Sequence, residues 1–277
     1  MKLDKKKIKD HLTTKFIGSD IYIYGKVEST NDIAKELTNN GCKEGTVIIA
    51  DLQSKGRGRQ GRRWESPEGV GIYLSIVLQP EKIIPQLTLV AGVSAAEAII
   101  TSCKLQVTSN VILSEAKNLN RESRIFLKWP NDININGKKA GGILTEAIEN
   151  GKAIIVGIGI NVNTELSMFT DELKNKATSI MMETGKRVDR NLLIAELLNR
   201  FEYWYKKFNV GQGFSLANET VIKRWKELSD TSGRRVKVNV GDSVFEGVAL
   251  GLDNDGSLMI RLDDGFLKKV SAGEICY

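Results

Sequence analysis

The segment from Gly56 to Trp64, GRGRQGRRW, holds four arginines, three glycines and no carboxylate. It has no apolar face to bury, so it has little reason to order by itself. Glycine lets backbone N–H groups approach a ligand closely, and guanidinium groups bind carboxylate or phosphate oxygens two at a time. The segment therefore predicts a loop that orders over an anionic ligand. The alternative is a solvated cationic surface.

We expect a strand on each side of this loop. The β-branched run 46–50 precedes it and the apolar run 70–78 follows it. Gly56, Gly58 and Gly61 match the GxGxxG string of dinucleotide-binding proteins, but that motif has to open a helix. Here the loop leads into another strand, and no P-loop motif occurs. We therefore expect arginine side chains to carry any phosphate binding.

The scarcity of reactive side chains excludes several mechanisms. His11 is the only histidine, which argues against Ser-His-Asp and Cys-His chemistry. Cys42, Cys103 and Cys276 form no CxxC pair, so we expect no zinc site and no disulfide framework, as in a reducing cytoplasmic compartment. No apolar run of about 18 residues is present, so no membrane partner is expected. The net charge of +6 favours anionic ligands.

Hydrophobic periodicity predicts a mixture of helices and strands. Ser29 and Asp32 stand at near-capping-box spacing where one helix should begin. We expect helices over 2–14, 29–41, 86–103, 191–207 and 215–229, strands over 20–26, 46–50, 70–78, 125–129, 133–135, 142–149 and 153–162, and hairpin turns at Asn136-Gly137 and Asn150-Gly151.

The hydrophobic pattern of the sequence changes after Asp230. Short alternating segments separated by glycine turns continue for about 45 residues, which predicts a small β-barrel. We therefore expect one domain over 1–229 and a second over 230–277. Within the first, residues 106–122 are polar and aperiodic. They predict a surface insertion that is dispensable for chemistry.

A second polar cluster should lie where two strands meet. The run from Lys128 to Asp132, KWPND, ends one strand and begins the next, and its proline favours a strand edge where side chains can turn toward a cleft. Lysine suits a carboxylate that attacks a phosphate, because the two anions repel until a cation bridges them. Lys139 adds a second cation, and Asn161 and Asn163 add two amides. Taken singly, each has an ordinary alternative as a surface or strand residue.

The motifs QxxGRGRxGRxW, KWPND, KxAGGILTE and GIGINVN, in this order, resemble those of the biotin–protein ligases, also called biotin–[acetyl-CoA-carboxylase] ligases. The resemblance covers nearly the whole chain from Val27 onward. It implies an α+β fold, with a mixed sheet and flanking helices similar to class II aminoacyl-tRNA synthetases, followed by an SH3-like barrel. It also implies that biotin and ATP, accompanied by Mg²⁺, give biotinyl-5′-AMP and pyrophosphate. Biotin then passes to one lysine of a biotin carboxyl carrier protein, such as that of acetyl-CoA carboxylase.

Carried over position by position, the resemblance implies roles for individual residues. Arg59 and Lys128 would be catalytic, neutralising the biotin carboxylate and the α-phosphate, and Trp64 would stack on adenine. No protein ligand of the metal can be named. Biotin would be bound by Ser29, Thr30, Asn31, Gln53, Gly56, Arg57, Gly58, Arg59, Lys128, Gly142 and Leu144, and the nucleotide by Arg59, Arg62, Trp64, Asn131, Lys139 and Asn161. The alternatives are a core aromatic for Trp64 and helix capping for Ser29 and Thr30.

Regulatory members of this family carry an N-terminal DNA-binding domain, and here the motifs start too early for one, so we expect no DNA partner. Pairing of two chains through the central sheet is the assembly that relatives suggest. One alternative function is a lipoate or octanoate ligase, which lacks the arginine-rich loop and needs no Gln53. The other is a nucleic-acid-binding module, whose affinity would fall steeply with salt.

Overall fold

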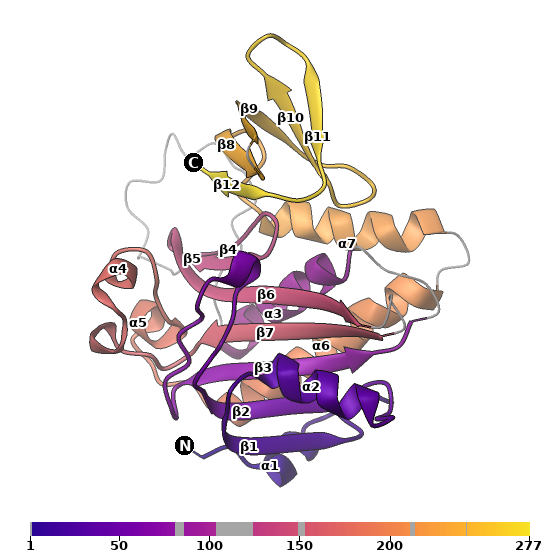
Figure 1. Ribbon diagram of the computed structural model, residues 1–277, viewed down its shortest axis with the longest axis vertical. Coiled ribbons are helices and arrows are strands. Elements are labelled where there is room, and N and C mark those ends of the chain that lie inside the picture. The colour runs from indigo at the N-terminus through magenta and orange to yellow at the C-terminus, as the bar shows by residue number, and fades with distance from the viewer. Residues whose placement is uncertain (1, 81–85, 104–123, 149–152, 211–213, 242) are drawn as a thin grey trace.

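The computed structural model describes residues 2–80, 86–103, 124–148, 153–210, 214–241 and 243–277. The expected insertion at 106–122 and the expected Asn150-Gly151 turn lie outside these ranges. The described chain forms two sheets, the larger flanked by helices (Figure 1).

The larger sheet has seven strands in the order β1-β2-β3-β7-β6-β5-β4. β1 pairs with β2 in parallel, and the other neighbours are antiparallel. The sheet is therefore mixed, as expected. Its strands are β1 (Ile21–Val27), β2 (Val47–Gln53), β3 (Gly71–Leu78), β4 (Ile125–Lys128), β5 (Asp132–Ile135), β6 (Lys138–Ile148) and β7 (Ala153–Asn161).

Helices cover both faces of this sheet. The long helices α3 (Leu87–Cys103) and α6 (Arg190–Val210) pack on one face, and α2 (Thr30–Asn39) packs on the other (Figure 1). α7 (Phe214–Leu228) lies along α3, between the sheet and the C-terminal strands. The short elements are α1 (Lys5–Lys9), η1 (Arg59–Gly61), η3 (Leu166–Met168), α4 (Asp171–Lys174) and α5 (Ile180–Thr184).

The two covered faces explain why β3 is buried along its whole length. Leu74 and Ile76 join the large apolar cluster with α3 and α6, whereas Val77 packs with Ala34 of α2 and with Ile155 on the opposite face. A strand covered on both faces needs a continuous apolar sequence. The α2 face carries the candidate site.

The C-terminal sheet has five antiparallel strands in the order β11-β10-β9-β8-β12. They are β8 (Arg235–Val240), β9 (Ser243–Leu252), β10 (Leu258–Leu262), β11 (Leu267–Val270) and β12 (Glu274–Cys276). Val236 and Val238 point into its core, following the alternation seen in the sequence. The α+β class, with a mixed sheet and a C-terminal β unit, is confirmed. The boundary between residues 229 and 230 stays a prediction.

Several element boundaries were wrong. The expected helix over 2–14 is only Lys5–Lys9, and the backbone N–H groups of residues 15–17 instead donate to the carboxylate of Glu202. β6 begins at Lys138, ahead of residue 142, because its first residues pair with β5. The elements α4 and α5 are single turns, which are too short for a periodic signal.

Candidate functional site

A cleft of about 670 Å³ lies beside α2, on the face of the sheet opposite α3. Strands β6 and β7 form its floor, and the turn between β4 and β5, the arginine-rich loop (residues 56–64) and β12 form its walls. The structure brings the expected site residues together here. Those that line the cleft are Ser29, Thr30, Asn31, Gln53, Arg57, Gly58, Arg59, Arg62, Trp64, Lys128, Asn131, Lys139, Gly142, Leu144 and Asn161. Gly56 alone of the expected set is not among them.

Glycines on neighbouring strands make the floor flat. Gly142 of β6 pairs with Gly159 of β7, and Gly157 lies two residues earlier on the same face. A Cβ on Gly159 would lie 2.7 Å from the indole of Trp64, and one on Gly142 would lie 3.5 Å from it. The Trp64 ring therefore rests on the glycine floor, in space that side chains at these positions would occupy.

Trp64 connects the two expected subsites. Lys139 Nζ lies 5.7 Å from the centre of its ring and 2.5 Å from a carboxylate oxygen of Asp132. The indole N–H is buried and has no acceptor among the described residues. Trp64 and Lys139, which were expected at the nucleotide, thus adjoin Gly142, which was expected at biotin. A ligand atom that accepts a hydrogen bond would satisfy the indole.

The arginine-rich loop forms a small hairpin. The Trp64 N–H donates to Gly56 O at 2.8 Å, and the Gly58 N–H donates to Arg62 O at 2.7 Å. The loop, which was expected to have little reason to order by itself, is held by carboxylates from distant segments. Arg57 pairs with Asp32 of α2, and Arg62 pairs with Glu274 of β12.

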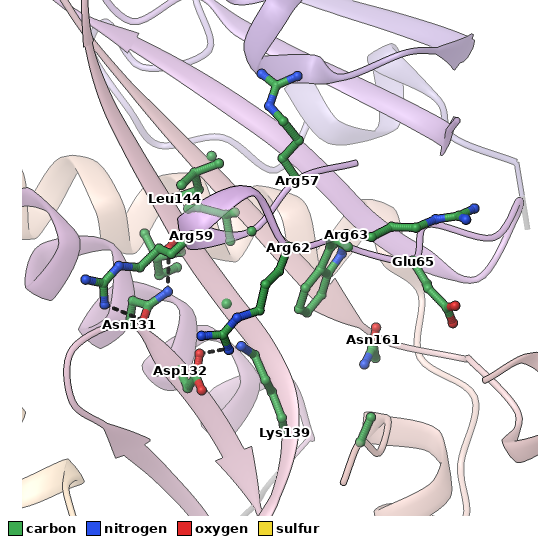
Figure 2. Close-up of a pocket in the computed structure, with 18 of the residues that line it drawn as sticks. Arg57, Arg59, Arg62, Arg63, Glu65, Asn131, Asp132, Lys139, Leu144 and Asn161 are labelled. Carbon is green, nitrogen blue, oxygen red and sulfur yellow. Dashed lines mark hydrogen bonds and ion pairs between the residues drawn. The ribbon is translucent and has the colours of Figure 1, made fainter. Parts of the chain in front are cut away.

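Arg59 points toward the β4–β5 turn, whereas Arg57 points away from it (Figure 2). Arg59 Nη1 donates to Asn131 Oδ1 at 3.3 Å and to the carbonyl oxygen of Gly273 at 3.1 Å. Burial lowers the pKa of Arg59, although a guanidinium stays charged in proteins. A permanent, partly desolvated cation therefore stands at the cleft.

The first turn of α2 presents its hydroxyl groups to the cleft. Ser29 occupies the N-cap position, but its side chain makes no capping hydrogen bond, and Asp32 pairs with Arg57. The expected capping box is therefore wrong. Thr30 donates through its backbone N–H and its hydroxyl to Gln53 Oε1, at 2.8 and 3.1 Å. This arrangement fixes the amide plane of Gln53.

Lys128 lies at the opposite wall, beside the C-terminal strand. Its Nζ is 5.1 Å from the centre of the Tyr277 ring. The Tyr277 hydroxyl contacts Thr231 Oγ1 at 2.9 Å and donates to Asp230 Oδ1 at 3.1 Å. Burial raises the pKa of Tyr277, so this hydroxyl stays protonated at neutral pH.

The structure adds cleft residues that were not expected from the sequence. Asp132 was visible within KWPND, as a carboxylate beside expected cations. Six others had no local signal: Phe169, Leu173 and Ala177 come from the segment around η3 and α4, and Glu274, Ile275 and Cys276 come from β12. Only the tertiary fold brings these two segments to the cleft.

Among the described residues, no group of three or more His, Cys, Asp and Glu side chains could hold a metal ion. No described helix is long and apolar enough to cross a membrane.

Comparison with known proteins decides the family. Residues 24–163 match the biotin/lipoate A/B protein ligase family, and residues 231–276 match the biotin protein ligase C-terminal domain. The chain belongs to the biotin/lipoate protein ligase family. It is 36% identical to the bifunctional ligase/repressor BirA of Bacillus spizizenii, over 99% of this chain and 79% of that protein.

Two further members of the family extend the similarity. The chain is 28% identical to the biotin–[acetyl-CoA-carboxylase] ligase of Paracoccus denitrificans, over 85% of this chain and 92% of that one. Among solved structures, it is similar to the biotin protein ligase from Aquifex aeolicus in complex with biotin and ATP. The TM-score is 0.74 at 32% identity, covering 93% of this chain and 98% of that one.

Proposed function

We propose that this protein is a biotin–protein ligase, which activates biotin with ATP and transfers it to a lysine of a biotin carboxyl carrier protein. One observation carries the proposal. The cleft joins the Thr30–Gln53 pair, whose hydroxyl and amide groups match a ureido ring, to the cations Arg59, Lys128 and Lys139. Biotin carries a ureido ring at one end and a carboxylate at the other, so each end of the molecule has a matching group in the cleft.

In the first step, a carboxylate oxygen of biotin attacks the α-phosphorus of ATP. The new C–O–P linkage forms as the bond to the β-phosphate breaks and pyrophosphate leaves. The two reactants are both anions, so their approach requires fixed positive charge. We assign that role to Arg59 and Lys128, with Lys139 and Arg62 at the phosphates. Trp64, Asn131 and Asn161 would border the nucleotide.

In the second step, the uncharged ε-amine of the carrier lysine attacks the acyl carbon. AMP leaves as the amide forms, and the amine loses its proton to solvent. Both nucleophiles are therefore substrates, which fits a chain whose only histidine, His11, lies in an exposed segment. The protein contributes positioning, charge and exclusion of water from the mixed anhydride.

Mg²⁺ would enter as the partner of ATP, held chiefly by phosphate oxygens and water. An ion that arrives with ATP needs few protein ligands, and the cleft fits this role. The carboxylate of Asp132 lies beside the proposed phosphate end, where it pairs with Lys139. Magnesium would neutralise the leaving pyrophosphate.

We further propose a cytoplasmic location and self-association through the large sheet. β1 pairs with β2 on one side and with no other described strand. A second copy could extend the sheet at such an edge. Light scattering with and without biotin and ATP would measure the assembly, and a monomer under all conditions would reject pairing.

The deciding experiment incubates the protein with ATP, Mg²⁺ and either biotin or lipoate, and identifies the acyl-adenylate by mass spectrometry. We expect biotinyl-5′-AMP, and biotinylation of an added carrier domain. Activation of lipoate but not biotin would establish the alternative within this family. Nucleic-acid binding without activation of either acid would reject both.

A further inference from the structure

Arg57, the first arginine of the arginine-rich loop, is turned away from the proposed reaction centre. Figure 2 shows its guanidinium on the far side of the loop from Asn131, Asp132 and Lys139. Both of its terminal nitrogens donate to Asp32 of α2, at 2.6 and 2.5 Å. A two-bond pair between guanidinium and carboxylate fixes orientation as well as distance. The hydrogen bonds from Arg57 also hold the pKa of Asp32 below its usual value.

Asn31, which precedes Asp32, is equally engaged within the protein. Its Oδ1 accepts from Ser75 Oγ at 2.6 Å, and its Nδ2 donates to Glu146 Oε2 at 2.5 Å. The side chain packs directly against Gly157 of β7, where an added Cβ would collide with Asn31 Oδ1. One of its two N–H donors and one of its two acceptor positions are therefore committed to contacts within the protein.

Glu146 of β6 connects the side chain of Asn31 with that of Arg57. It accepts from Asn31, pairs with Lys35 Nζ at 2.9 Å, and lies 4.0 Å from the guanidinium of Arg57. Two carboxylates, Asp32 and Glu146, thus face two cations within one partly buried cluster. The same turn of α2 carries Thr30, whose hydroxyl accepts from Ser75 at 2.8 Å.

We propose that Asp32, supported by Glu146, fixes the start of the arginine-rich loop to α2, so that the side chains of Arg57 and Asn31 position the cleft and do not bind biotin. This inference rests on the proposed function. It makes the ureido pocket and the start of the loop one rigid unit. Movement of the loop is then confined to the segment from Arg59 to Arg63, which follows the Arg57–Asp32 pair.

Retention of the biotinyl adenylate tests this proposal. In Asp32→Asn the carboxylate is lost, the start of the loop loosens, and the adenylate should escape about five to ten times faster, as expected for loss of roughly one charge-assisted pair. Asp32→Glu keeps the charge and should restore most of the retention. The matched control is Glu28→Gln, which removes the exposed Lys55–Glu28 pair at the entrance to the same loop and should change nothing.

Trypsin cleavage gives a readout that does not depend on the reaction. With the pair intact, cuts should follow Arg59, Arg62 and Arg63, whereas Asp32→Asn should add a cut after Arg57. If the unmodified protein makes no adenylate, the proposed function fails, and the cleavage pattern still tests the pairing. Unchanged retention and unchanged cleavage in Asp32→Asn would overturn the inference.

A double variant separates positioning from ligand contact. If Arg57 acts through Asp32, the combination Asp32→Asn with Arg57→Gln should release adenylate no faster than Arg57→Gln alone. If the two effects multiply, Arg57 has a separate interaction, and its assignment as a positioning residue is wrong. Thermal unfolding of each variant shows whether the fold is intact.

Discussion

Two cations contact the ring of Tyr277, with Lys128 Nζ 5.1 Å and the Arg234 guanidinium 4.5 Å from its centre. Lys128 is the last residue of β4, at the proposed reaction centre, and Tyr277 follows β12 of the other sheet. The pair therefore joins the two sheets beside the cleft. It also holds a proposed catalytic lysine on an aromatic face.

Replacing Tyr277 with alanine should free Lys128. A contact of this kind contributes about 0.5–1 kcal/mol, so we expect adenylate formation to slow roughly two- to fivefold. Tyr277→Phe keeps the ring but loses the contacts to Thr231 and Asp230, and it should keep most of the rate. Single-turnover kinetics measures both variants. Equal losses in the two variants would assign the effect to the hydroxyl.

Gly159→Ala should displace Trp64. The added methyl would meet the indole at 2.7 Å, and the backbone of β7 cannot retreat because it pairs on both sides. We expect biotin affinity to fall about five- to 150-fold, which corresponds to the 1–3 kcal/mol cost of overpacking. Gly25→Ala in β1 is the control, since nothing lies within 4 Å of its Cβ position. Isothermal titration calorimetry measures the biotin affinity of each variant. If Gly159→Ala binds biotin as tightly as the unmodified protein, Trp64 can move aside without cost.

Arg59→Ala and Lys128→Ala should each remove charge from the reaction centre. Loss of one preorganised donor to a developing anion costs about 3–4 kcal/mol, so adenylate synthesis should fall roughly 10²–10³-fold. Lys55→Ala, which removes an exposed cation close to the loop, should leave the rate unchanged. Near-normal biotinyl-AMP synthesis in either variant would remove that residue from the mechanism. In that case Lys139, which pairs with Asp132, is the next candidate.

Glu202 should stabilise the protein in a pH-dependent way. Burial alone would raise its pKa, but hydrogen bonds from Lys206 and from the backbone of residues 15–17 outweigh burial, so the pKa falls below 4.5. A carboxyl whose pKa is lower in the folded state stabilises that state above its unfolded pKa. This contribution is lost as the pH falls from about 4.5 through the lowered value.

The corresponding variant is Glu202→Ala, which leaves three backbone N–H groups without their acceptor. We expect it to lower the free energy of unfolding at pH 7 by about 2–3 kcal/mol. The control is Glu196→Gln on the same helix, where a helical pair with Arg200 contributes at most about 0.5 kcal/mol. Urea unfolding at pH 7 and at pH 3 should show the Glu202→Ala difference shrinking in acid. A difference independent of pH would mean that packing, and not charge, is lost.

The sequence predicted most of the large sheet because its signals are local. The alternation of Gly157, Gly159 and Asn161 with buried isoleucines marks one strand face, and the Asn136-Gly137 turn marks a hairpin. The alanine-rich helix over 87–103 is equally local. Period and turn chemistry act within about ten residues, so they can be recognised without the fold.

The contacts that hold the arginine-rich loop could not be predicted in this way. Arg59 donates to a carbonyl 214 residues further along the chain, and no periodicity relates such positions. The pairing of Asp32 with Arg57 displaced an expected capping role, because a two-bond ion pair is stronger than a helix cap. Whether the assigned residues touch biotin or nucleotide stays a prediction.

The C-terminal unit holds a loop of the larger sheet's domain, because Glu274 pairs with Arg62 and the carbonyl oxygen of Gly273 accepts from Arg59. Exchanging the C-terminal sheet between relatives would therefore also exchange the contacts that hold the arginine-rich loop. In a chimaera without a carboxylate at position 274, Arg62 would lose its partner. Its turnover would then depend on the relative that supplied the C-terminal sheet as much as on the relative that supplied the cleft.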